Sequence, residues 1–183
     1  MTKVAVIVGS LRRESINRRL ARALATLGEP KGLTLSLLKV DDLPLYNEDL
    51  WQDPPTSVQR LKQELKDAGA VLFVTPEYNR SIPAVVKNVV DWGSRPMVDS
   101  VWPGKPAAIV GASPGAIGTA VAQSHLRSIL PSLGVALLSR PEIYISLKPG
   151  QLDEQGKVTD EGLEKLLNGF LDAFVKWLNR VSE

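Results

Sequence analysis

Short apolar runs alternate along this chain with longer segments in which apolar residues recur every three or four positions. Runs of the first kind suit strands that are buried on both faces of a parallel sheet, and segments of the second kind predict amphipathic helices. The predicted strands cover residues 4–8, 33–38, 70–75, 105–112 and 136–138, and residues 143–145 extend the fifth. The second run begins with alternating apolar and polar residues, which indicates a strand nearer the sheet edge.

One predicted helix follows each predicted strand. The first begins at Ile16 behind Ser15 as its N-cap, Pro83 opens the third, and the fourth runs from Ile117 to a stop at Gly134. The clearest apolar period is that of the last helix, over residues 163–181. The order βαβαβαβαβα predicts a parallel sheet with helices on both faces, within a single domain that spans residues 1–183.

Composition then narrows the functional classes. Of the 183 residues, 44% are hydrophobic and 23% are charged, and the formal net charge is only +2, so nothing favours nucleic-acid binding. The chain has no cysteine and one histidine, which excludes disulfides, thiolate catalysis and zinc sites built from thiolates or several histidines. It has no signal-peptide pattern and no apolar run of about 18 residues. We therefore expect a cytoplasmic protein that binds neither a metal nor a membrane.

Three segments that follow strand ends are rich in small or polar residues: 10–17, 76–81 and 113–118. In open parallel sheets, ligands bind outside the carboxyl ends of the strands, where the strand order reverses. In the flavodoxin-like order 2-1-3-4-5, strands one, three and four are neighbours, so the three segments line one crevice. The sequence therefore predicts an α/β fold, a three-layer α/β/α sandwich around a five-stranded parallel sheet, with its ligand in this crevice.

Each segment suits a different part of a ligand. The first combines a helix N-terminus with hydroxyl, amide and guanidinium donors, which suits a phosphate, although an ordinary turn capped by Ser15 has the same local sequence. The second pairs a rigid proline turn with the ring of Tyr78, and the third keeps its side chains small, so that a flat ring can approach the backbone. The chain has neither a Walker Gly-x4-Gly-Lys loop nor the Gly-x-Gly-x-x-Gly fingerprint, so the sequence favours FMN over ATP.

Two motifs stand at the first and second of these segments. They read Gly9-Ser10-Leu11-Arg12-x-x-Ser15-x-Asn17 and Pro76-Glu77-Tyr78-Asn79-x-Ser81-x-Pro83-x-x-x-Lys87-Asn88-x-x-Asp91-Trp92. They resemble the NADPH-dependent FMN reductase family, and within it the bacterial chromate and quinone reductases, over nearly the whole chain. The resemblance implies a flavodoxin-like fold, bound FMN, NADH or NADPH as electron donor, and assembly into a homodimer or homotetramer.

By match of position, the resemblance assigns the FMN phosphate to the first segment and the isoalloxazine ring to the second, mostly through backbone groups and Tyr78. The positions assigned to the cofactor are Ser10, Leu11, Arg12, Ser15, Ile16, Asn17, Pro76, Glu77, Tyr78, Asn79, Arg80 and Ser113. Two positions depart from the family pattern, since Ala84 replaces a frequent glycine and Gly118-Thr119 replaces a frequent Gly-Gly. Both changes add bulk near the expected flavin crevice, which bears on substrate range and flavin affinity.

The resemblance implies an oxidoreductase in which the flavin carries the redox chemistry and no side chain is an essential acid or base. Nicotinamide and acceptor would use one flavin face in turn, which predicts ping-pong kinetics with quinones, chromate, azo compounds or free flavin as acceptor. Arg80 and Arg95 are candidates for the NADPH phosphates. Two other functions remain open: a flavodoxin-type electron carrier without NAD(P)H activity, and a non-redox nucleotide or phosphate-ester enzyme. Flavodoxin carriers are typically acidic whereas this chain is slightly basic, and no nucleophile has a base partner.

Four aromatic side chains have a structural interpretation beside a functional one. His125 is expected to pack in the core or at an interface rather than to act in catalysis, and Trp92 to anchor the core or an interface rather than to stack on the flavin. Tyr46 and Trp51 either fasten the long loop that carries them or cover a site or a partner surface.

Overall fold

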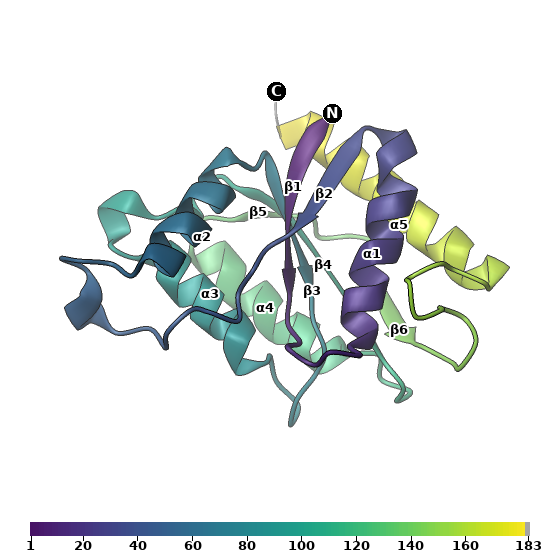
Figure 1. Ribbon diagram of the computed structural model, residues 1–183. Helices are drawn as coiled ribbons and strands as arrows, with labels where there is room; N and C mark the ends of the chain where they lie inside the picture. The colour runs from purple at the N-terminus through teal and green to yellow at the C-terminus, as the bar shows by residue number, and fades with distance from the viewer. Residues whose placement is uncertain (182–183) are drawn as a thin grey trace.

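The computed structural model describes residues 1–181 and shows a parallel sheet of six strands in the order β2-β1-β3-β4-β5, with β6 beside β4 (Figure 1). The strands are β1 Thr2–Val8, β2 Leu33–Leu37, β3 Ala70–Val74, β4 Pro106–Ser113, β5 Ala136–Leu137 and β6 Tyr144–Ser146. This order confirms the flavodoxin-like topology that the alternation of apolar runs and amphipathic segments predicts.

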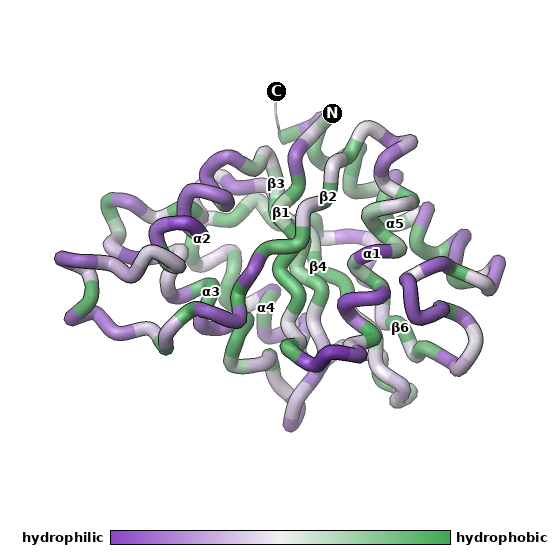
Figure 2. The backbone as a smooth tube through the Cα atoms, viewed as in Figure 1, coloured by the Kyte–Doolittle hydropathy of each residue, from purple (hydrophilic) through white to green (hydrophobic). Residues whose placement is uncertain are grey.

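Helices cover both faces of the sheet. They are α1 Ile16–Gly28, α2 Thr56–Asp67, α3 Ala84–Ser94, α4 Ala120–Ser132 and α5 Glu161–Val181. Successive strand side chains point to opposite faces, so Val6 joins the core beneath α1 and α5, and Ile7 joins the core beneath α2, α3 and α4. Figure 2 shows the hydrophobic stretches concentrated in the central strands. Among residues 1–181, no helix is long and apolar enough to cross a bilayer.

The strand register brings the carboxyl ends of β1, β3 and β4 to the same edge of the sheet. Val8 lies opposite Val74, and Val74 lies opposite Val110. Just beyond this row, the N–H of Gly9 donates to the carbonyl of Val74, and the N–H of Thr75 donates to the carbonyl of Val110, each at 2.9 Å. The three loops that the sequence singles out therefore leave the sheet side by side, at the lower edge in Figure 1.

The fifth strand differs from the prediction, because it is divided into two short strands. β5 pairs with Pro106 and Ala107, and β6 pairs with residues 111–113, so both lie on the same edge of β4. Side chains of α4 bind the carbonyls at the two ends of the interruption. Arg127 donates to the carbonyl of Leu138 at 3.0 Å, and Gln123 donates to that of Ile143 at 2.9 Å. These hydrogen bonds replace the strand pairing that the interrupted segment lacks.

Helix α4 also begins later than the apolar period predicts, at Ala120 rather than Ile117. The reason is the backbone of Gly118 and Thr119, whose φ angles of +59° and +71° are left-handed and cannot continue a right-handed helix. A Cβ on Gly118 would lie 2.6 Å from the carbonyl carbon of Tyr144, so glycine also permits the close approach of this turn to β6.

The long loop between β2 and α2 is fastened to α3. The side chain of Asn88 accepts from the N–H of Tyr46 at 2.8 Å and donates to the carbonyl of Pro44 at 2.9 Å. The indole of Trp92 donates to the same carbonyl at 2.9 Å, and its ring meets Tyr46 edge-on at 5.1 Å between centroids. These contacts confirm that Tyr46 packs the loop down and that Trp92, which is buried, anchors the core.

Candidate functional site

The loop after β1 offers a row of unpaired backbone donors. Among the described residues, nothing accepts a hydrogen bond from the N–H groups of residues 11–17. Residues 11–14 are exposed, including the guanidinium of Arg12, while Ile16 is half-buried as the first residue of α1. Buried Ser15 is the N-cap, and its hydroxyl accepts from the N–H of Arg18 at 3.3 Å. Free N–H groups at the positive end of a helix dipole bind anions, so this loop has the donors that a phosphate requires.

Asn17 connects this loop to β4. Its side-chain amide donates to the carbonyl of Ala112 and accepts from the N–H of the same residue, both at 2.9 Å. The side chain is 1% exposed, so these hydrogen bonds are shielded from water. Asn17 thereby fixes the start of α1 against the strand that carries the third loop.

The loop after β3 contains a tight hairpin. Pro76 is buried, whereas Tyr78 and the two residues after it are exposed. Tyr78 and Ser81 exchange two backbone hydrogen bonds of 3.0 Å, and between them Asn79 and Arg80 have φ angles of +50° and +62°. Two successive left-handed residues define a type I′ turn, which favours asparagine at the first position and glycine at the second. Holding an arginine there costs about 1–2 kcal/mol, and strain of this kind is typical of functional sites.

Glu77 holds this hairpin against the third loop. Its carboxylate accepts from the N–H groups of Val121 and Ala122, at 2.9 and 3.1 Å, and so caps the N-terminus of α4. No side chain of α4's own N-cap residue, Thr119, supplies such a hydrogen bond. The guanidinium of Arg80 lies 3.8 Å from the same carboxylate. Because the Glu77 side chain is turned toward α4, the hairpin presents its backbone and Tyr78 to the outside.

Two further contacts join the hairpin to its neighbours. The hydroxyl of Tyr78 donates to Ser10 in the first loop at 3.5 Å, and Ser10 itself is buried. The hydroxyl of Ser81 lies 3.0 Å from Nδ1 of His125 on α4. His125 is expected to pack in the core or at an interface, and its exposed side chain excludes the core. Its partner lies 44 residues away, and the apolar period of α4 gives no signal of that contact.

The end of β4, which leads into the third loop, lies very close to the backbone that follows β3. A Cβ on Gly111 would lie 2.1 Å from the carbonyl oxygen of Thr75, so only glycine fits there. Ser113 is half-buried, and its hydroxyl donates to the carbonyl of Gly115 at 3.2 Å. Thr119 is 1% exposed and accepts from the amide of Gln123 at 3.1 Å. The extra bulk at Thr119 therefore lies in the interior rather than at the loop surface.

The two arginines proposed for a dinucleotide are not brought together. Arg80 lies in the hairpin before α3, whereas Arg95 follows the last residue of that helix. A helix of 11 residues is about 16 Å long, so the two positions lie at opposite ends of α3. Arg95 instead borders a pocket of about 330 Å³ that also contains Trp51 and Trp92. Among the described residues, no group of three or more histidine, aspartate or glutamate side chains is placed to hold a metal ion.

The family model described as NADPH-dependent FMN reductase matches residues 2–150. A 2-hydroxy-1,4-benzoquinone reductase from a Burkholderia species is 47% identical over 176 residues, covering 96% of both chains. A quinone reductase from Pseudomonas putida is 47% identical over 180 residues, covering 97% of this chain and 96% of the other.

A solved structure is similar throughout. FerB from Paracoccus denitrificans, described as a flavoenzyme NAD(P)H:(acceptor) oxidoreductase, superposes with a TM-score of 0.94 and is 48% identical. The similarity covers 98% of each chain.

Proposed function

The chain belongs to the NADPH-dependent FMN reductase family, and from that premise we propose that it holds FMN at the three loops and passes electrons from NADH or NADPH to quinones. It is an NAD(P)H-dependent flavin oxidoreductase, as its relatives are. The single observation that carries the placement of FMN is the row of unpaired N–H groups over residues 11–17. They supply donors for the FMN phosphate, and Arg12 adds a guanidinium with bidentate geometry.

Within the proposed site, the residues have two kinds of role. Ser10, Leu11, Arg12, Ser15 and Ile16 belong to the loop that receives the phosphate. The side chain of Asn17 is paired with Ala112, so it positions that loop, and its backbone N–H remains available to the phosphate.

The hairpin and the third loop form the side of the site that receives the ring. Within residues 1–181, the N–H groups of Asn79 and Arg80 have no acceptor, so they can donate to polar atoms at the edge of the isoalloxazine. Tyr78 contributes an exposed aromatic ring, and Pro76, Glu77 and Ser113 hold the surrounding backbone. Bound FMN supplies the redox chemistry, whereas the chain supplies position and hydrogen-bond donors. The hydroxyl of Ser81 lies 3.0 Å from Nδ1 of His125, and the proposal assigns this pair no part in the redox chemistry.

Acceptor and donor share this one site in the proposed mechanism. Because the same exposed loops must receive a nicotinamide and then an acceptor, the two bind alternately, which corresponds to ping-pong kinetics. Small planar acceptors fit such a site, so quinones are the principal class, with azo compounds, free flavin and chromate as further acceptors. Ala84 is exposed at the start of α3 and adds a methyl group beside the hairpin, which can restrict the larger acceptors.

We also infer that the protein is a cytoplasmic single domain that assembles into a homodimer or homotetramer. Support for assembly comes from apolar side chains that a monomer leaves in water. Met97 is 76% exposed and Val98 is 97% exposed, directly after α3, and Leu45 is 78% exposed in the loop that packs on that helix. Light scattering of the purified protein measures the number of chains.

A visible spectrum followed by a kinetic assay tests the function. The proposal predicts a yellow protein, or one that turns yellow with added FMN, that oxidises NADH or NADPH and reduces a benzoquinone. Bound flavin without NAD(P)H oxidation would instead indicate a flavodoxin-type carrier. A protein that gains no flavin absorption with FMN would contradict the proposal altogether.

A further inference from the structure

A short hairpin between β6 and α5, residues 152–158, packs on α1 beside the loop of residues 10–17. Leu152 and Val158 form an antiparallel bridge, and the carboxylate of Asp153 accepts from the N–H of Lys157 at 2.8 Å. At its turn, Gly156 has a φ of +93°, and a Cβ there would lie 2.7 Å from the carbonyl oxygen of Arg19. Only glycine permits this approach, so the hairpin is seated on α1 by backbone contact. Figure 1 shows this segment alongside α1.

The seated hairpin and the helix enclose a pocket of about 260 Å³. Arg18, Arg19 and Arg22 line it from α1, Arg13 and Glu14 line it from the loop before α1, and Glu154 and Gln155 line it from the hairpin. Among the described residues, none of the four arginines is part of an ion pair, and Nε of Arg18 is buried without a hydrogen-bond partner. Four arginines against two glutamates, Glu14 and Glu154, leave the pocket with a formal excess of two positive charges.

These arginines destabilise α1 when no anion is bound to them. Arg18 and Arg22 are four residues apart, a spacing at which like charges repel. The first turn of α1 carries no acidic residue, although acidic residues stabilise that end of a helix. The pocket is also bordered by Ser15, the N-cap of α1. It therefore lies next to the loop proposed to receive the FMN phosphate.

Guanidinium groups recognise phosphate by bidentate hydrogen bonds. The opposite wall differs, because a carboxylate and an amide can bind sugar hydroxyls and the amino group of a purine. A concave pocket with these two walls is better suited to bind a nucleotide than to bind a flat polyanion. We propose that this pocket is a second phosphate subsite, which binds the adenosine phosphate end of a dinucleotide whose redox end reaches the loops. The assignment rests on the proposed function, which places the FMN phosphate in the adjacent loop.

Two dinucleotides carry this chemistry: the electron donor NADPH, whose adenosine bears a 2′-phosphate, and FAD, whose adenylate extends from the flavin phosphate.

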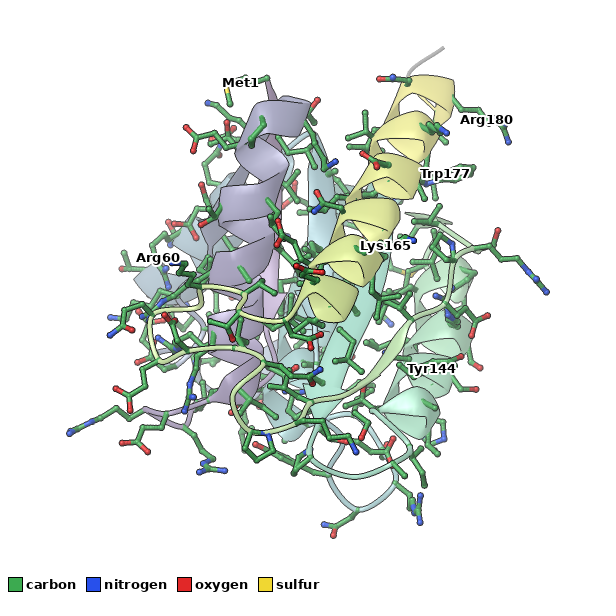
Figure 3. The ribbon with its side chains drawn as sticks, turned by 90° about the vertical axis from the view of Figure 1, so that its right-hand side faces the viewer. Met1, Arg60, Tyr144, Lys165, Trp177 and Arg180 are labelled. Carbon is green, nitrogen blue, oxygen red and sulfur yellow. The ribbon has the colours of Figure 1, made fainter. Side chains whose placement is uncertain are left out.

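The test variant is Arg18→Gln/Arg22→Gln. The control is Arg140→Gln/Arg180→Gln, which removes the same charge from exposed arginines elsewhere. Figure 3 shows Arg180 at the C-terminal end of α5, at the opposite end of that helix from the hairpin.

Calorimetric titration of FMN-loaded protein with 2′,5′-ADP tests the first source, and titration of flavin-free protein with FAD and FMN tests the second. In the test variant, we expect at least tenfold weaker binding of 2′,5′-ADP or of FAD, with less than a twofold change for FMN and no loss in the control. Weaker 2′,5′-ADP binding identifies the donor, and weaker FAD binding identifies a flavin adenylate. Unchanged binding of both, or an equal loss in the control, overturns the subsite. FMN binding and NADH oxidation that persist in that case leave the proposed function standing.

Discussion

Asn17 and Ala112 are joined by two hydrogen bonds of 2.9 Å, in which the side-chain amide of one residue pairs with both backbone groups of the other. The pair lies in the interior, 95 residues apart along the chain, and it connects the start of α1 to the end of β4. Two of the three loops of the proposed flavin site are thereby fixed relative to one another.

Replacing Asn17 by alanine leaves the N–H and carbonyl of Ala112 without partners in the interior. Each unsatisfied buried group costs about 1–3 kcal/mol, so we expect Asn17→Ala to lower the free energy of unfolding by about 2–4 kcal/mol. Urea denaturation followed by circular dichroism measures the loss. Asn168→Ala is the control, because that side chain donates only one bond, within α5, and should cost less than about 0.5 kcal/mol. Equal midpoints for the two variants would contradict this role of Asn17.

Glu77 is the N-terminal cap of a helix that begins 43 residues later. Removing its carboxylate in Glu77→Ala leaves two N–H groups of α4 unpaired, and we expect a loss of about 1–2 kcal/mol in unfolding free energy. Glu77→Gln keeps a neutral acceptor and should lose roughly half as much. Thermal unfolding of both variants measures this order. A Glu77→Ala protein as stable as the parent would show that the carboxylate does not cap α4.

Replacing glycine by alanine is expected to change the free energy of unfolding in opposite directions at two positions, Gly111 and Gly169. A Cβ on Gly111 would meet the backbone oxygen of Thr75, the residue after β3, at 2.1 Å, and a backbone atom cannot move aside cheaply. We expect Gly111→Ala to cost about 3 kcal/mol or more. Gly169 lies within α5 with nothing within 4 Å of its Cβ position, so Gly169→Ala should stabilise the protein by about 0.5–1 kcal/mol. Guanidinium denaturation of both variants checks the signs, and two losses of similar size would be inconsistent with these contacts.

The carboxylate of Asp99 accepts hydrogen bonds from Lys62 and Lys66, at 2.7 and 2.6 Å, and these bonds hold its pKa below its usual value. A pKa that is lower in the folded state stabilises the protein above the unfolded-state pKa of about 3.9, and this contribution is lost as the pH falls through the folded pKa. Asp99→Asn should therefore lower the melting temperature at pH 7, with the difference shrinking below about pH 4. The side chain is about half exposed, so the effect will be modest. A difference that stays constant from pH 7 to pH 3 would contradict the ion pair.

The strand order, and the meeting of the three loops at one edge of the sheet, could be predicted from the sequence because both depend on local pattern. The run from Val4 to Val8 has the length and apolarity of a buried strand, and Ser15 with Ile16 marks a helix start. Once strands and helices alternate, the topology rules bring the three loops to one edge.

Contacts between distant segments could not be predicted in this way. The double hydrogen bond of Asn17 depends on the backbone of Ala112, and the capping by Glu77 depends on where α4 begins. The interruption between β5 and β6 depends on hydrogen-bond donors from α4. The pattern of apolar residues in 136–146 gives no sign of these donors. The contact between His125 and Ser81 could not be predicted for the same reason, since Ser81 lies in a different loop.

The unpaired N–H groups of residues 11–17 are proposed to hold the phosphate of FMN. Flavin-free protein is titrated with FMN and with riboflavin, which lacks only the phosphate. The quenching of flavin fluorescence gives the two affinities, and their ratio tests the proposal. Charge-assisted hydrogen bonds contribute about 1.5–3 kcal/mol each, so FMN should bind at least about tenfold more tightly than riboflavin. Arg12→Ala should weaken FMN binding and leave riboflavin binding unchanged. Equal affinity for FMN and riboflavin would contradict the account.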